Sequence, residues 1–126
     1  MPQPTIAPTL LIVDDDPFFL DTLALLFAEE GYRVRTANTF ERGELELKRS
    51  LPDVLVVDVR LGAFNGLQLT AMAERAIPTI VLTGHDDATL KRTAHRLGAE
   101  YLVKPVPAEE LFEAVRRQLL VGIMAR

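Results

Sequence analysis

Acidic, hydroxyl and basic side chains stand directly after short apolar runs of this sequence. Asp14 and Asp15 follow the first run, Asp58 follows a later one, and Thr83 and Lys104 follow the last two. If the fold brings these three carboxylates together, each pair separated by 4 Å would repel by about 4 kcal/mol at an effective dielectric of 20. A hard divalent cation relieves such repulsion, and Mg²⁺ suits a site with few carboxylates and open positions. The pattern therefore predicts a magnesium site at Asp14, Asp15 and Asp58.

The same positions suggest chemistry on a phosphoryl group. Lys104 supplies a point positive charge, and the Thr83 hydroxyl with nearby backbone N–H groups, such as that of Gly84, supplies donors to an anion. We expect Asp58 to be the nucleophile that accepts the phosphoryl group as an acyl phosphate. Mg²⁺ and Lys104 would neutralise charge on a loose, in-line transition state. A carboxylate nucleophile needs no general base, so neither histidine is required.

Each of these residues, taken alone, has an ordinary structural explanation. A lone run of three aspartates is most often a helix-capping turn, and Asp16 is expected to be only the cap. Asp58 alone would be a turn residue at a strand end, and Lys104 alone a solvated lysine. Only the conjunction of Asp58 with Asp15, Thr83 and Lys104 favours a functional site.

The elements that must position these residues alternate along the chain. Five β-branched or leucine-rich runs predict strands, and only the second alternates between polar and apolar residues, which indicates an edge strand. The predicted strands are Thr9–Val13, Tyr32–Thr36, Val54–Val57, Thr79–Leu82 and Tyr101–Val103. This order predicts an α/β fold with a doubly wound parallel sheet and helices on both faces. The carboxyl ends of its strands form the crevice where ligands bind.

Caps and apolar periodicity predict the helices between those strands. The predicted helices run from Asp16–Pro17 to Gly31, from Asn38 or Thr39 to before Pro52, from Asn65 to before Pro78, from Asp86 or Asp87 to Gly98, and from Pro107 to about Leu120. The fourth carries Leu90, Ala94 and Leu97 on one face. Phe18, Phe19 and Phe27 are expected to pack in the core and along the first helix.

Length and composition limit the classes of function. The chain has 126 residues, which leaves room for one domain. We expect this domain to comprise residues 9–121, with a disordered arm at residues 1–8 and a C-terminal tail at residues 122–126. The net charge of −4 is opposite to that of a nucleic-acid binder. The absence of cysteine and the short apolar runs favour a cytoplasmic protein that does not bind a membrane.

Five segments, in this order, resemble the receiver domain of two-component response regulators. They are Leu11–Pro17, Pro52–Asp58, Asn65–Gly66, Pro78–Gly84 and Leu97–Pro105. The resemblance runs from Thr9 to about Leu120. It implies the flavodoxin-like (βα)5 fold with strand order 2-1-3-4-5.

The resemblance also implies a role for each matching residue. Asp58 is then the phosphoacceptor, Asp15 a direct Mg²⁺ ligand, Asp14 a ligand acting largely through water, and the backbone carbonyl of Arg60 a further ligand. Lys104 would bind the phosphoryl oxygens.

The resemblance implies a conformational switch as well. Thr83 and Tyr101 would be the switch pair, and the Lys104–Pro105 peptide bond would be cis. Phosphorylation would then shift an equilibrium between two forms of the surface built from residues 86–98, 101–103 and 107–120.

These features predict a signalling protein that receives its phosphoryl group from a sensor histidine kinase or a phosphotransfer protein. It would act through a downstream protein target or an output domain and would turn over no outside substrate, so it would not be an enzyme in the ordinary sense. The chain could equally be the receiver fragment of a larger regulator whose output domain, for example a DNA-binding one, is not part of this chain.

Two other classes fit the residues less well. A small-molecule phosphatase that works through an aspartyl-phosphate requires a second aspartate, as acid/base, two residues after the nucleophile. This chain has Arg60 at that position. A phosphate-independent interaction module would not need the acidic residues.

Overall fold

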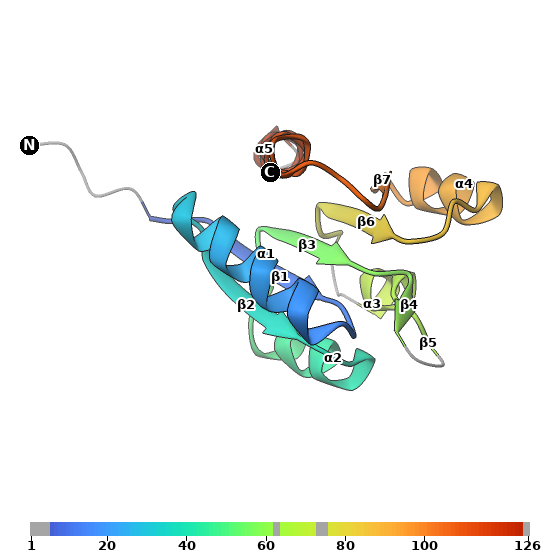
Figure 1. Ribbon diagram of the computed structural model, residues 1–126, viewed down its shortest axis with the longest axis horizontal. Coiled ribbons are helices and arrows are strands. Elements are labelled where there is room, and N and C mark those ends of the chain that lie inside the picture. Colours follow the sequence, from blue (N-terminus) through green and yellow to red (C-terminus); the bar gives the residue numbers. More distant parts are fainter. Residues whose placement is uncertain (1–5, 62–63, 73–75, 125–126) are drawn as a thin grey trace, which may run out of the picture.

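A five-stranded parallel sheet forms the centre of the molecule (Figure 1). The computed structural model describes residues 6–61, 64–72 and 76–124. The strands lie in the order β2-β1-β3-β6-β7, which is 2-1-3-4-5 when the parallel strands are counted along the chain. Their bounds are β1 Thr9–Val13, β2 Arg33–Ala37, β3 Val54–Val57, β6 Thr79–Thr83 and β7 Glu100–Val103. The predicted fold class and strand order are confirmed, with β2 at an edge.

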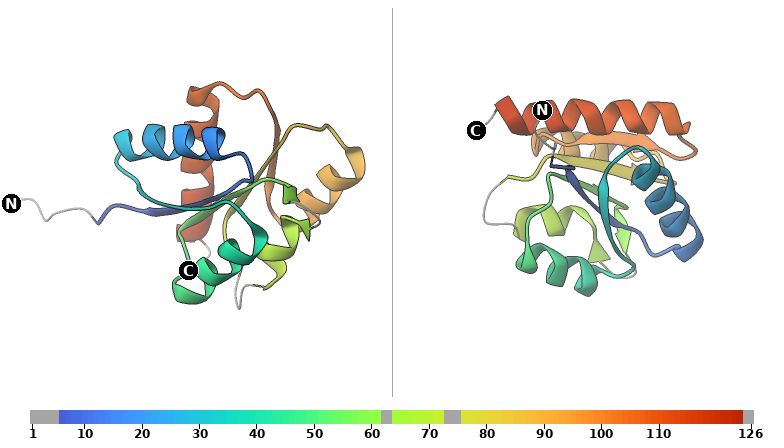
Figure 2. Two further views of the ribbon diagram at one scale, coloured as in Figure 1. Left: turned by 60° about the horizontal axis from the view of Figure 1, so that its bottom comes forward. Right: turned by 90° about the vertical axis from the view of Figure 1, so that its left-hand side faces the viewer.

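Helices cover both faces of the sheet. They are α1 Pro17–Glu29, α2 Phe40–Arg49, α3 Leu67–Met72, α4 Ala88–Arg96 and α5 Ala108–Met124. The buried side chains of α1 and α5 join one apolar cluster, and those of α2, α3 and α4 join another. Figure 2 shows α1 and α5 on one side of the sheet and α2 and α3 on the other.

Strand β3 and the last four residues of β1 are apolar at every position because both faces of these inner strands are covered. Leu10 and Ile12 of β1 pack with α1 and α5, while Leu11 and Val13 pack on the opposite side. All four are at most 1% exposed. This double burial fixes the ends of β1 and β3 relative to each other.

Helix caps follow the sequence at most termini. The carboxylate of Asp16 accepts hydrogen bonds from the N–H groups of Phe18 and Phe19, and Asp87 caps α4 in the same way. Thr39, one of the two candidates, caps α2 by accepting from the Arg42 N–H. Gly31, which ends α1, has a φ of +95°, a conformation that favours glycine.

The start of the third helix differs from the prediction. Asn65, the predicted cap, lies in strand β5 (Phe64–Asn65), which pairs antiparallel with β4 (Arg60–Leu61). This pairing holds Asn65 in extended backbone, so α3 begins at Leu67. The predicted stretch after Met72 includes residues 73–75, which lie outside the described residues.

Two apolar side chains are exposed contrary to expectation. Phe18 is 81% exposed because it lies two residues, about 200° around the helix, from Leu20 on the buried stripe of α1. Leu97 is 49% exposed because it is the C-cap of α4, beyond the helical stripe.

Helix α5 continues through residues 122–124, which the sequence suggested as a tail. No helix in the described part of the chain is long and apolar enough to span a membrane.

Candidate functional site

Three carboxylates meet at the carboxyl ends of β1 and β3. Val13 and Val57 are register partners on these neighbouring strands, so Asp14 and Asp58, which follow them, come together. Oxygen atoms of Asp14, Asp15 and Asp58 all lie within 4.8 Å of one another. Asp14 is 3% and Asp58 9% exposed, whereas Asp15 is open to solvent. The structure thus brings together the three acidic residues predicted to bind a metal.

Backbone hydrogen bonds hold two of these residues in place. The Asp58 N–H donates to the Val13 carbonyl at 3.0 Å, and the Asp14 N–H donates to the Ala37 carbonyl at 3.1 Å. The Asp14 side chain is fixed as well, because its Oδ1 accepts from the Asp16 N–H at 2.9 Å. Both residues are therefore anchored to the sheet and not to a free loop.

Lys104 carries the positive charge of the site. Its Nζ donates to Asp14 Oδ2 at 2.9 Å and to Asp58 Oδ2 at 3.5 Å. Its own N–H donates to the Thr83 carbonyl at 2.7 Å, which fixes the residue at the end of β7. Burial by itself would lower the pKa of Lys104, but the hydrogen bond and charge of Asp14, and then those of Asp58, raise it above 10.5.

Phe19 is a contact of Lys104 that the sequence did not reveal. The ammonium lies 4.1 Å from the centroid of the Phe19 ring, a cation–π geometry. The sequence suggested Phe19 only as a packing residue. Its place in the first turn of α1, just after the aspartates, was the one available sign that it could reach the site.

We expect the stability of the metal-free protein to fall above about pH 10 because of Lys104. A pKa raised on folding means that the folded state holds the proton more tightly, so the stabilisation is complete below the unfolded-state pKa and is lost as the pH rises through the folded-state value. Urea unfolding of wild type and Lys104→Met from neutral to strongly alkaline pH checks this.

The wild type should lose stability more steeply than the variant in that comparison. Burial also raises the pKa of Tyr32, which titrates in the same range with the same sign. Both proteins contain Tyr32, so only the difference between the two curves reports Lys104, and parallel curves would contradict the assignment.

The charge of the cluster fits a divalent cation. Three carboxylates and one ammonium give a formal charge of 1 − 3 = −2 in a partly buried site. Carboxylate oxygens are the ligands that Mg²⁺ takes in proteins, together with waters, and the exposed Asp15 leaves room for those waters.

Thr83 and Tyr101 hold the loop between β6 and α4. The N–H of His85 donates to Thr83 Oγ1 at 3.2 Å. The Tyr101 hydroxyl donates to the His85 carbonyl at 2.9 Å and accepts from the Asp87 N–H at 2.9 Å. Thr83 is 1% and Tyr101 9% exposed, so both side chains point inward. Thr83 and Tyr101, the predicted switch pair, therefore both form hydrogen bonds with the loop between β6 and α4.

The remaining predicted residues lie around the cluster. Gly84 follows Thr83 at the end of β6 and is exposed. Arg60 is the first residue of β4, two positions after Asp58. The Lys104–Pro105 peptide bond is cis, as the resemblance implied.

Gly66 keeps the segment after Asp58 close to the site. A Cβ atom at this position would overlap the backbone oxygen of Asp58 and lie 2.6 Å from Val57 Cγ2. The Gly66 N–H donates to the Val59 carbonyl at 2.6 Å, which closes the turn. Only glycine allows this approach of backbone to backbone.

We expect Gly66→Ala to lower the free energy of unfolding by about 1–3 kcal/mol, because the added methyl group forces the turn away from Asp58. Chemical denaturation measures this. Gly84→Ala is the matched control, since a Cβ there would meet nothing within 4 Å, and its stability should change by less than about 0.5 kcal/mol. Equal effects of the two substitutions would contradict the steric role of Gly66.

Comparison with known proteins places this arrangement in a family. The model of the response regulator receiver domain matches residues 10–116. The transcriptional regulatory protein GlrR of Escherichia coli (strain K12) is 36% identical over 110 residues, which are 84% of this chain and 25% of GlrR. The positive alginate biosynthesis regulatory protein of Pseudomonas aeruginosa PAO1 is 40% identical over 115 residues, which are 86% of this chain and 46% of that protein.

A solved structure agrees with these relatives. A receiver domain protein (CheY-like) from Methanospirillum hungatei JF-1 has a TM-score of 0.89 and 26% identity, covering 96% of this chain and 100% of that one. In contrast, the chain spans only about a quarter of GlrR and less than half of the alginate regulator.

Proposed function

The chain belongs to the response regulator receiver domain family of two-component signalling, and from that membership we propose that Asp58 accepts a phosphoryl group and thereby changes a protein-binding surface. One observation carries the proposal: the Lys104 ammonium lies between Asp14 and Asp58, at 2.9 and 3.5 Å from their oxygens. A carboxylate that is held beside a cation at a rigid strand end is prepared for attack on an anionic phosphoryl group.

In the proposed transfer, an Asp58 carboxylate oxygen attacks the phosphorus of a partner's phosphohistidine. The P–O bond forms as the P–N bond breaks, and the released imidazole nitrogen takes a proton from solvent. Lys104 neutralises charge on the phosphoryl oxygens, and the Thr83 hydroxyl and Gly84 N–H donate to them.

Asp14, Asp15 and Asp58, with the backbone carbonyl of Arg60, would hold Mg²⁺. The ion, when bound, supplies positive charge that offsets the carboxylates and the incoming phosphoryl oxygens. Asp14 would act largely through water, since its two oxygens already accept hydrogen bonds from Asp16 and Lys104.

The proposed switch uses Thr83 and Tyr101. If the Thr83 hydroxyl turns to the phosphoryl group, it gives up the hydrogen bond from the His85 N–H. Tyr101 holds the same loop through His85 and through Asp87, the N-cap of α4. A change at Thr83 is thereby transmitted to the start of α4, and we propose the surface of α4, β7 and α5 as the one that changes.

The partners proposed on this basis are a sensor histidine kinase or phosphotransfer protein and a downstream protein or output domain. Because the matched relatives are longer than this chain, we propose that it can serve as the receiver part of a larger regulator. Transfer onto its own aspartate and the later loss of that phosphate are the only reactions proposed for it.

Incubation with acetyl phosphate and Mg²⁺, followed by intact-mass measurement, tests the function. The wild type should gain the mass of one phosphoryl group, and chelation of the metal by EDTA should prevent the gain. No gain with Mg²⁺, over a time in which acetyl phosphate itself persists, would refute the proposal.

A further inference from the structure

The aromatic ring of Phe19 lies beside the cation of the acidic site. The Lys104 Nζ is 4.1 Å from the ring centroid, inside the roughly 6 Å at which the face of an aromatic ring attracts a cation. The same Nζ contacts oxygens of Asp14 at 2.9 Å and of Asp58 at 3.5 Å. Two carboxylates and one ring therefore hold the ammonium, and only the ring is uncharged.

Phe19 is fixed in the first turn of α1. Its N–H donates to the carboxylate of Asp16, the N-cap, at 3.3 Å. Its partly buried side chain packs against the apolar cluster that α1 and α5 share. Turning the ring away from Lys104 would expose apolar surface that is now covered, which is unfavourable. The ring is therefore a fixed surface, whereas the lysine is a charge on a flexible four-carbon chain.

The two carboxylates have a second role in the proposed reaction. Asp14 and Asp58 are among the residues that would bind Mg²⁺, and a bound cation offsets the negative charge that attracts the ammonium. Mg²⁺ takes oxygen ligands, so the ring of Phe19 does not compete for it. The attraction between the ring and Lys104 is therefore the one of these contacts that a metal ion does not weaken directly.

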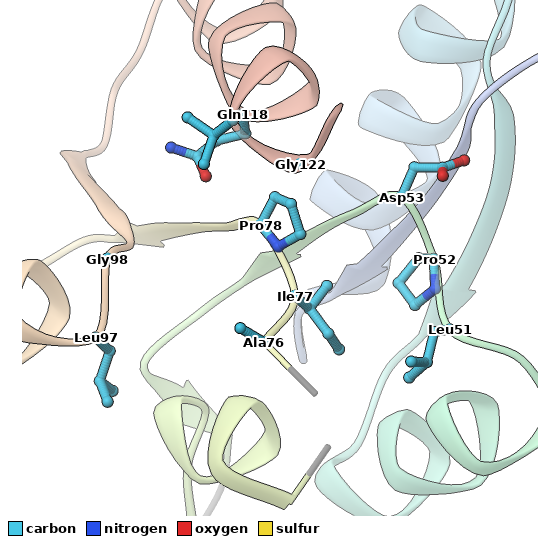
Figure 3. A pocket seen from close by; sticks show the side chains of 11 residues that line it. Leu51, Pro52, Asp53, Ala76, Ile77, Pro78, Leu97, Gly98, Gln118 and Gly122 are labelled. Atoms are coloured by element: carbon cyan, nitrogen blue, oxygen red, sulfur yellow. The ribbon is translucent and has the colours of Figure 1, made fainter. Parts of the chain in front are cut away.

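A pocket at the opposite end of the sheet has no such cation (Figure 3). It lies between the segments that precede β3 and β6 and the last turns of α5, with Pro52, Pro78 and Gly122 among its residues. The described residues that line it include no lysine or arginine. It therefore offers no positive charge to a phosphoryl group, in contrast to the strand ends where Phe19 and Lys104 lie.

We propose that Phe19 is a positioning residue, whose ring keeps the Lys104 ammonium at the acidic site when the carboxylates are engaged by Mg²⁺. This role rests on the proposed phosphorylation of Asp58. A lysine that is already in place loses less conformational freedom when it meets the phosphoryl oxygens, so the transfer is faster. Phe19 acts through Lys104 and not on the phosphoryl group itself.

Fluorination of the Phe19 ring tests this role. Fluorine withdraws electron density from the ring face and weakens its attraction for a cation, while the shape of the ring changes little. Mono-, di- and trifluorinated phenylalanine are incorporated at this position alone in the full chain. The rate of phosphoryl gain from acetyl phosphate and Mg²⁺ should fall in that order, by about 3- to 30-fold for the last. Equal rates along the series would overturn the proposal, because the ring would then act by its shape.

Phe19→Leu and Phe18→Leu are a matched pair of variants. Both remove an aromatic ring from the first turn of α1, but Phe18 is 81% exposed. Phe19→Leu keeps an apolar side chain against the core and should slow the reaction at least as much as the trifluorinated ring. Phe18→Leu should keep the wild-type rate, and an equal loss in both variants would contradict a specific role of Phe19. The fluorinated series decides the question if Phe19→Leu fails to fold.

The ¹H NMR signal of the Lys104 ε-methylene group reports the contact without any reaction. Protons near the face of an aromatic ring are shifted upfield, so this signal should lie upfield of those of Lys48 and Lys91, the other lysines of the chain. Its absence in Lys104→Met assigns it. The signal should stay upfield when the wild type is saturated with Mg²⁺, and Phe19→Leu should return it to the ordinary position.

A wild-type signal that moves to the ordinary position when Mg²⁺ is added would overturn the proposal, since the ring would then release the ammonium in the metal-bound site. Failure of the proposed function gives a different result, because the wild type would then gain no phosphoryl group whatever ring stands at position 19. An upfield signal that persists with Mg²⁺, together with rates that fall along the fluorinated series, supports the role of Phe19.

Discussion

Asp58→Asn is expected to gain no phosphoryl group from acetyl phosphate and Mg²⁺, a fall in rate of at least about a thousandfold. Asparagine has nearly the same shape as aspartate and keeps one oxygen near Lys104, so the fold should persist. The amide, however, is neutral and a poor nucleophile, and it removes one of the three carboxylates that would bind the metal. Intact-mass measurement over time gives the rate.

Asp53→Asn is the matched control for this variant. Asp53 precedes β3 and Asp58 follows it, so the same substitution is made at opposite ends of one strand. An asparagine oxygen can still accept the hydrogen bond that Asp53 takes from the Thr9 N–H. Asp53→Asn should therefore gain phosphate like the wild type. An equal gain in Asp58→Asn would place the phosphoacceptor elsewhere.

Lys104→Met is expected to slow phosphorylation by about 100- to 1,000-fold, the usual cost of removing one preorganised charge from a transition state. Methionine is similar in length to lysine and can still contact the Phe19 ring, so the change is mainly one of charge. The rate of mass gain with acetyl phosphate measures the effect.

Mg²⁺ binding separates this role from a merely structural one. The Lys104 ammonium donates to Asp14 and Asp58 and so competes with a cation for the same carboxylates. Lys104→Met should therefore bind Mg²⁺ more tightly in isothermal titration calorimetry while it is phosphorylated more slowly. A structural defect would weaken both.

Lys91→Met is the control for net charge, since Lys91 is an exposed residue of α4 that likewise loses one positive charge. Its phosphorylation rate should match that of the wild type. A rate for Lys104→Met within about twofold of this control would contradict the proposed role of Lys104.

Most of the acidic site could be predicted from the sequence because its geometry follows from the strands. Residues that follow parallel strands lie at one edge of the sheet, and Asp14 and Asp58 meet there because β1 and β3 are neighbours. Caps such as Asp16 and Asp87 were predictable for a similar reason, since they act over three residues.

Features that depend on the direction of a side chain were not predictable in this way. Phe18 and Phe19 are neighbours in the sequence, yet one is 81% exposed and the other covers the Lys104 ammonium. The helical period turns Phe18 about 200° away from Leu20, whereas only the packing of α1 on the sheet brings the Phe19 ring to 4.1 Å from the ammonium. The hairpin of β4 and β5 was missed because its pairing is too short to leave a periodic pattern.

Local sequence patterns specify the alternation of strands and helices, the strand ends at which the carboxylates lie, and the kind of chemistry they support. These depend on local patterns and on the handedness of parallel crossovers. Lys104 lies closer to Asp14, 90 residues away in the chain, than to Asp58, and this arrangement depends on tertiary packing. Tertiary packing also places Gly66 against the Asp58 backbone. Such contacts join residues with no local relation in the sequence, so their geometry is set by how the whole core packs.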